Sequence, residues 1–173
     1  MLRTAPGVIA LAAVLCLLAL DRAASPAMAD GRGAVSRDGR VGPLVVGRSG
    51  RRAVRRFAGR PTRIQRGKGE GGARFVMYRY RCGSGCTTYF FFDGDGRLAN
   101  FITRSRRYRT TAGTRIGQTE QQAEAREGAP AKRGPCSSDY GINRSGRAQL
   151  HIGITRGRVR VLAVAGTNSV LGC

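Results

Sequence analysis

Apolar and aromatic residues alternate with polar ones through the middle and the C-terminal third of the chain. This spacing, with many aromatic and β-branched residues, predicts β-strands. The predicted strands are "RFVMYRYRC" (74–82), "CTTYFFFD" (86–93), "GRLANFITRS" (96–105), "AQLHIGIT" (148–155) and "RVRVLAVAG" (158–166). "GSG" and "DGDG" separate the first three strands and are turn signals. The dipeptide Arg156-Gly157 predicts a tight hairpin between the last two.

Two short helical patterns precede these groups of strands. The segment "VGRSGRRAVRRFAGRP", Val46 to Pro61, aligns with "IGQTEQQAEAREGAP", Ile116 to Pro130, with one residue deleted. Each segment has a hydroxyl residue at the expected helix start, Ser49 or Thr119, then about two turns, then a glycine and a proline that end the helix. In the second segment, Thr119 and Gln122 fit a capping box. The pattern therefore predicts two degenerate copies of a helix followed by a β-meander.

The two predicted repeats cover residues 42–106 and 107–173, and together they indicate an α+β fold with an antiparallel sheet and helices on one face. The repeated pattern, G-x-S/T-x-x-x-A followed by G-x-P and a meander, resembles the repeat unit of the SmpA/OmlA (BamE-like) and β-lactamase-inhibitor-protein-like families. The matching pairs are Gly47 with Gly117, Ser49 with Thr119, Ala53 with Ala123, and Pro61 with Pro130. The resemblance implies a concave sheet with the helices behind it, and a partner that is a protein of the cell envelope or of the extracellular space.

The first 29 residues are organised like a secretory signal peptide. Uncharged residues run from Val8 to Leu20, and Ala27 and Ala29 fit a small-x-small cleavage pattern. The apolar run is shorter than the roughly 20 residues that a membrane-spanning helix needs. We therefore expect cleavage after Ala29 and secretion, the alternative being an uncleaved N-terminal anchor. Residues 30–41 have no apolar periodicity, which predicts a flexible tail.

The chain is strongly basic, with 31 lysines and arginines against 10 acidic residues and a formal net charge of +21. Such a charge attracts anionic polymers such as nucleic acid, teichoic acid or acidic polysaccharide. Coding bias is the other explanation, because arginines far outnumber lysines and the chain has 26 glycines. Coding bias does not account for the small number of acidic residues.

Four cysteines follow the predicted signal peptide: Cys82, Cys86, Cys136 and Cys173. An even number in an exported chain predicts a disulfide framework with three possible connectivities, of which we favour Cys82 with Cys86 and Cys136 with Cys173. A four-cysteine zinc site usually has two close pairs, and here there is one. A redox motif would be C-x-x-C, whereas the close pair is C-x-x-x-C. We therefore expect neither a metal nor a cofactor.

Candidate catalytic residues are few. His151 is the one histidine, and the alternation of its strand places it on the less buried face, where no residue of the sequence is assigned as a nucleophile. Asp93 and Asp95 lack the glutamate that a calcium loop requires, and they fit a β-turn. A small secreted hydrolase that uses His151 is therefore the last of three hypotheses, and we expect a protein that is not an enzyme.

The two cysteine-flanked strands carry the most informative pattern. If Cys82 pairs with Cys86, the numbers of facing residues sum to 168. One side then carries core residues: Tyr78, Tyr80, Phe90 and Phe92. The other side carries the candidate binding residues: Met77, Arg79, Arg81, Tyr89 and Phe91.

One interpretation of this second side is that another element of the fold covers it. Aromatic residues flanked by arginines are also typical of protein interfaces, and aromatics can stack on nucleic-acid bases. We predict a secreted, non-enzymatic protein that binds an envelope or extracellular protein through this face, with an anionic polymer as the alternative partner.

Overall fold

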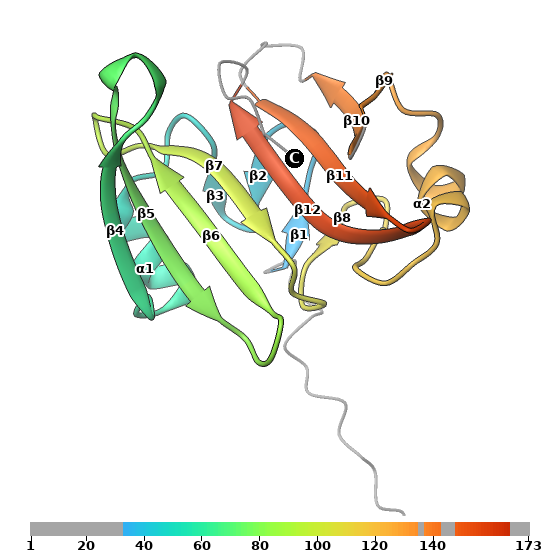
Figure 1. The fold of residues 1–173 in the computed structure, drawn as a ribbon, viewed down its shortest axis with the longest axis horizontal. Helices are drawn as coiled ribbons and strands as arrows, with labels where there is room; N and C mark the ends of the chain where they lie inside the picture. The colour runs from blue at the N-terminus through green and yellow to red at the C-terminus, as the bar shows by residue number, and fades with distance from the viewer. Residues whose placement is uncertain (1–32, 135–136, 143–147, 167–173) are drawn as a thin grey trace, which may run out of the picture.

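The computed structural model describes residues 33–134, 137–142 and 148–166, and they form a mixed α+β fold (Figure 1). This part of the chain has two α-helices, α1 (Arg51–Ala58) and α2 (Glu120–Glu127), and a 3-10 helix, η1 (Glu70–Gly72). Its strands form an eight-stranded and a four-stranded sheet. The predicted α+β class is confirmed.

The eight-stranded sheet is antiparallel throughout, in the order β4-β5-β6-β7-β12-β11-β10-β9. Its strands are β4 (Arg63–Lys68), β5 (Arg74–Arg81), β6 (Thr87–Phe92), β7 (Leu98–Thr103), β9 (Lys132–Arg133), β10 (Ser137–Ile142), β11 (Ala148–Thr155) and β12 (Arg158–Gly166). α1 precedes β4 to β7 in the chain, and α2 precedes β9 to β12. The last strands of these two groups, β7 and β12, pair at the middle of the sheet, with Phe101 opposite Val164.

The register of the β5–β6 hairpin agrees with the sequence prediction. Each pair from Val76 and Phe92 to Arg81 and Thr87 sums to 168. A disulfide joins Cys82 to Cys86, whose Cα atoms are 5.1 Å apart. Alternate residues of β6 are buried, as expected for a strand with one face on the core.

The core lies on the side of the hairpin that carries Tyr78, Tyr80, Phe90 and Phe92, as the sequence predicted. Phe90 has no exposed surface, and its ring meets those of Phe57, Tyr80 and Phe101 at centroid separations of 6.5, 5.6 and 5.1 Å. Phe57 belongs to α1, and Arg55 of the same helix lies over the ring of Tyr78. α1 therefore packs on this face of the sheet, and edge-to-face rings fix its position.

The two helix starts differ in a way that the sequence alignment missed. Thr119 is the N-cap of α2, and it forms the predicted capping box with Gln122. The N-cap of α1 is Gly50, which has no side-chain cap. The Ser49 hydroxyl instead accepts a hydrogen bond from the backbone N–H of Val45 at 2.9 Å. The predicted hydroxyl N-cap of the first helix is wrong because the preceding strand takes this hydroxyl as its own partner.

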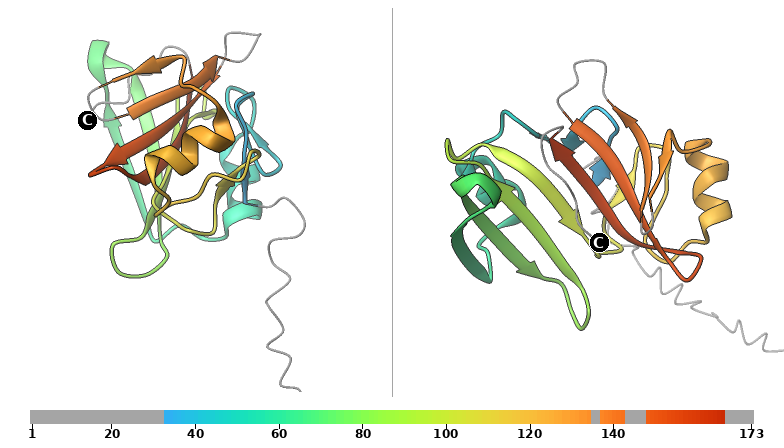
Figure 2. Two further views of the ribbon diagram at one scale, coloured as in Figure 1. Left: turned by 90° about the vertical axis from the view of Figure 1, so that its right-hand side faces the viewer. Right: turned by 45° about the horizontal axis from the view of Figure 1, so that its top comes forward.

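The predicted flexible tail over 30–41 is wrong in its described part, which begins at residue 33. Strands β1 (Ala34–Val35), β2 (Arg40–Val41) and β3 (Leu44–Val45) form the small sheet with β8 (Arg109–Thr110), in the order β3-β2-β1-β8. Val35 and Val41 have no exposed surface. The views in Figure 2 show this small sheet against the rest of the fold. Because strands of two residues bury about one side chain each, they leave no periodic pattern to detect.

The predicted signal peptide and its cleavage site lie outside the described residues. Within the described ranges, none of the helices is long and apolar enough to cross a membrane.

Candidate binding site on the open sheet face

The five predicted site residues lie side by side on the face of β5 and β6 opposite α1, which we call the open face. Arg79 is opposite Tyr89, and Met77 is opposite Phe91. Arg81 is exposed, and the other four side chains are partly exposed. In Figure 1, β5 and β6 lie in front of α1, so the open face is turned toward the viewer. The structure thus brings all five residues together.

Three aromatic rings form a continuous row on the open face, the aromatic ladder of Phe75, Phe91 and Tyr89. The centroids of Phe75 and Phe91 are 6.5 Å apart, and those of Phe91 and Tyr89 are 6.2 Å apart. Phe75 lies over Gly67 of the neighbouring strand, where a Cβ would be 2.8 Å from the ring. A glycine at this position therefore lets the ring rest on the backbone of β4 and extends the apolar surface to the edge of the sheet.

A surface hollow of ≈ 590 Å³ adjoins the Tyr89 end of the ladder, beside the disulfide turn. We call it the arginine hollow. Its lining includes Arg79, Arg81, Arg104, Ser84, Thr87 and Tyr89. Arg104 follows β7, and its backbone N–H donates to the carbonyl of Thr87 at 2.9 Å. This bond holds the third arginine against the hairpin that carries the other two.

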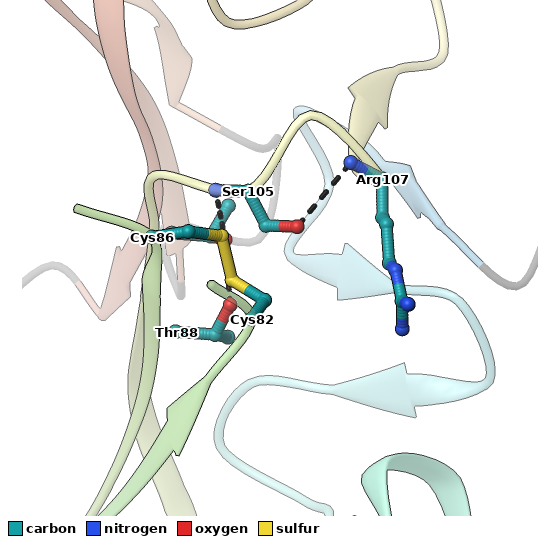
Figure 3. The surroundings of a disulfide bond; sticks show 6 residues. Cys82, Cys86, Thr88, Ser105 and Arg107 are labelled. Atoms are coloured by element: carbon teal, nitrogen blue, oxygen red, sulfur yellow. Dashed lines mark hydrogen bonds between the residues drawn. A yellow bond between two sulfur atoms is a disulfide. The ribbon is translucent and has the colours of Figure 1, made fainter. Parts of the chain in front are cut away.

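A short chain of buried hydroxyl groups fixes the segment after β7. The hydroxyls of Thr88 and Thr103 are 2.7 Å apart, and the backbone N–H of Ser105 donates to Thr103 Oγ1 at 3.0 Å. Ser105 Oγ then accepts from the backbone N–H of Arg107 at 3.3 Å (Figure 3). Because these hydroxyls bond to each other and to nearby backbone N–H groups, they set where the chain turns away from the sheet. That turn determines the position of Arg104.

Within the described ranges, the arginines of the hollow have no acidic partner. Among the lining residues there is no Asp or Glu, and no ion pair joins Arg79, Arg81 or Arg104 to a carboxylate of the described chain. Arg79 Nε is buried, and within the described residues it is the one such side-chain nitrogen or oxygen without a hydrogen-bond partner. A guanidinium offers five donors in a planar fork suited to an oxyanion. The hollow is thus an electropositive site that can receive a carboxylate, phosphate or sulfate.

The open face changes character beyond the centre of the sheet. One row of paired residues crosses the sheet from β6 to β11. In this row Tyr89 pairs with Ile102, Ile102 pairs with Ala163, and Ala163 pairs with His151. Ala163 and Ala165 share this face, yet they are only 2% and 0% exposed. His151 is partly exposed, and its neighbour in the pairing is Asp139. The exposed aromatic character is therefore confined to the half of the sheet formed by β4 to β7.

Two other predictions concern metal binding and the second disulfide. No three His, Cys, Asp or Glu side chains gather to hold a metal ion in the part of the chain that the structure describes. The predicted pair Cys136 and Cys173 lies outside the described residues.

The five residues predicted for protein binding did not include three contributors to this site: Gly67, Ser84 and Arg104, of which Arg104 was considered only as one of several arginines that could hold the phosphates of a nucleic acid. Arg104 was detectable in principle, because the pairing of β6 with β7 places the residue after Thr103 beside Thr87. For Gly67 the signal was weaker. A lone glycine in a strand indicates either a bulge or a close approach, and only the structure shows which.

Comparisons with known proteins describe the fold and not the site. No family model matches the chain, and no curated protein matches its sequence. The structure is similar to that of YjgB, a DUF4309 family protein from Bacillus subtilis subsp. subtilis str. 168, with a TM-score of 0.50 and 18% identity, covering 73% of this chain and 84% of that one. It is also similar to the uncharacterized protein YfeY from Escherichia coli, with a TM-score of 0.48 and 17% identity, covering 76% of this chain and 98% of that one.

At these identities, the likeness to YjgB shows the fold alone. YjgB is described as a DUF4309 family protein and not as a member of the SmpA/OmlA or β-lactamase-inhibitor-protein-like families. The resemblance of the sequence to those families stays a prediction.

Proposed function

We propose that this is a secreted, non-enzymatic binding protein that recognises an envelope or extracellular protein through the open face. The observation that carries the proposal is the aromatic ladder: its three rings are partly exposed, in contact with one another, and bordered by Arg79 and Arg81. Contiguous exposed apolar surface on a folded protein marks an interaction site. Aromatic residues and arginine are also the residue types enriched at protein interfaces.

Export is part of the proposal. We infer that residues 1–29 are a signal peptide cleaved after Ala29, on the basis of their charge and apolar pattern. The disulfide between Cys82 and Cys86 supports this inference, since structural disulfides persist mainly in oxidising compartments. The N-terminal sequence of the protein recovered from its native medium tests it, and a start near Asp30 is expected.

The two halves of the chain are proposed to be degenerate copies, with both helices behind the sheet as in the families that the sequence resembles. The matching backbone contacts support this idea. The N–H of Gly47 donates to the carbonyl of Leu98 at 2.7 Å, and the N–H of Gly117 donates to that of Val159 at 2.8 Å. In each half the segment before the helix is thus tied to the last strand of its group.

The proposed function is tested by capture on the immobilised mature protein from envelope extract and culture medium. The double variant Tyr89→Ala, Phe91→Ala removes two rings of the ladder. Ile64→Ala is the matched control, because Ile64 is 39% exposed and pairs with Tyr78 on the other face. We expect a defined protein to be captured by the parent and by the control, and lost with the double variant. Equal capture by all three, with the fold intact by circular dichroism, contradicts the proposal.

An anionic polymer is the second candidate partner, favoured by the net charge of +21. Neutralising several phosphates makes affinity fall steeply with salt concentration. Retention on a heparin or DNA resin well above physiological salt, with a steep salt slope, supports this alternative. Elution at or below physiological salt argues against it.

A further inference from the structure

We propose that the arginine hollow binds a carboxylate of an acidic peptide segment whose neighbouring apolar side chain packs on the aromatic ladder. This inference rests on the proposed function and specifies the chemistry of the partner. It assigns one part of the partner to the hollow and another to the rings of Tyr89 and Phe91.

The concentration of cationic and hydroxyl donors in the hollow indicates an oxyanion. Arg79, Arg81 and Arg104 converge from β5 and from the segment after β7, and Ser84 and Thr87 add hydroxyl groups. A buried polar atom without a partner is uncommon in folded proteins, and Arg79 Nε is such an atom. A carboxylate in the hollow would accept hydrogen bonds from the guanidinium groups that line it and would offset the repulsion among the three cations.

The distribution of charge and apolar surface favours a peptide over a polymer. A polymer with a charge on every repeat binds best to cations that follow its length, often with stacking rings between them. On the open face, the three arginines gather at the Tyr89 end of the ladder. From Tyr89 an apolar surface extends over Phe91 and Phe75 to Gly67. Met77, which pairs with Phe91, adds to this apolar surface. This layout matches a ligand with its negative charge at one end and an apolar group next to it.

The binding is tested with short synthetic peptides on the full mature protein. The probe is acetyl-Leu-Phe-Glu-Glu-amide, and acetyl-Leu-Phe-Gln-Gln-amide is its uncharged counterpart. Amide and arginine Nε resonances are followed during the titration. We expect the acidic peptide to shift the signals of Arg79, Arg81, Ser84 and Thr87, and the uncharged peptide to bind at least tenfold more weakly.

Variants separate this site from the general charge of the protein. The double variant Arg79→Gln, Arg81→Gln is expected to bind the acidic peptide at least tenfold more weakly. The control Arg52→Gln with Arg66→Gln removes the same charge at two exposed positions outside the hollow, and it is expected to change affinity less than twofold. Equal loss in both double variants overturns the inference, as does equal binding of the two peptides. Inorganic polyphosphate is titrated in parallel, and tighter binding of polyphosphate to the same residues overturns the peptide assignment in favour of a polymer.

The outcome is distinguishable from failure of the proposed function. If Tyr89→Ala with Phe91→Ala abolishes capture of a partner while the acidic peptide binds elsewhere or not at all, the proposed function stands and this inference fails. If the peptide binds at the hollow while the same variant captures its partner normally, the proposed function fails.

Discussion

Glu127, at the end of α2, joins three segments that are far apart in the sequence, and its replacement tests how the N-terminal strands are held. The residue is 6% exposed. Thr110 and Thr114 donate their hydroxyls to Glu127 Oε1, the second at 2.7 Å, and Arg37 Nη2 is 3.1 Å from Oε2. Arg37 lies in the turn between β1 and β2, so this carboxylate links the small sheet to the second helix.

Glu127→Gln keeps the shape of the side chain and removes its charge. One carboxylate oxygen becomes an NH₂ group, which must face either the guanidinium, a donor only, or the two hydroxyls, which would have to give up the bonds they donate to Oε1 in order to accept from it. A buried hydrogen-bonding group left without its partner costs about 1–3 kcal/mol. The Arg37 side chain is 44% exposed, so solvent screens its ion pair and we discount that contribution. We expect the free energy of unfolding to fall by about 1–3 kcal/mol, which lowers the urea midpoint by roughly 1 M.

Urea unfolding followed by circular dichroism measures this loss. Glu124→Gln is the matched control, because it makes the same chemical change one turn earlier in α2, where Glu124 pairs with the exposed Arg133. The control is expected to leave the midpoint almost unchanged. Equal midpoints for the two variants would refute the idea that Glu127 holds the small sheet in place.

Three further predictions concern tyrosine ionisation, the aromatic ladder and the disulfide. Burial raises the pKa values of Tyr80 and Tyr108 from 10.0 to about 12, so their stabilising effect is present below pH 10 and is lost as pH rises toward 12. Ultraviolet titration should show these two ionisations, and each should vanish in its Tyr→Phe variant. Gly67→Ala places a Cβ 2.8 Å from the ring of Phe75 and should cost about 1 kcal/mol in urea unfolding, with a changed near-ultraviolet circular dichroism spectrum; an unchanged spectrum contradicts the close contact. Replacing both cysteines of the hairpin disulfide by serine opens a very short loop and should cost about 2 kcal/mol, and failure to fold would show a larger role.

Features set by neighbours in the sequence were predictable. Glycines end both helices, as expected, and Gly59 and Gly128 have φ values of 81° and 79°. The Thr119 capping box was also predictable, because its groups are three residues apart. The alternation along β5 and β6, together with a three-residue turn between two cysteines, was enough to predict the register and both faces of the hairpin. In each case the interacting groups are close in the chain, so few other pairings compete.

Pairings between distant segments were not predictable in the same way. β1 runs parallel to β8, with Ala34 opposite Arg109, and neither two-residue strand has a pattern of its own. Ser49 was assigned to the helix after it, whereas its hydroxyl bonds to Val45 in the strand before it. Both misreadings arise because a short polar segment can find its hydrogen-bond partners in several places. The rest of the fold selects one of them.

The sequence by itself determined the α+β class, the longer strands β5, β6, β7, β11 and β12, and the face on which Met77, Arg79, Arg81, Tyr89 and Phe91 lie. It did so because side-chain alternation in a strand depends only on the local backbone. The tertiary structure decided that Arg104 joins the arginines of the hairpin and that Phe75 rests on Gly67. Those contacts depend on the order of strands in the sheet and on where the chain leaves it. No local pattern carries that information.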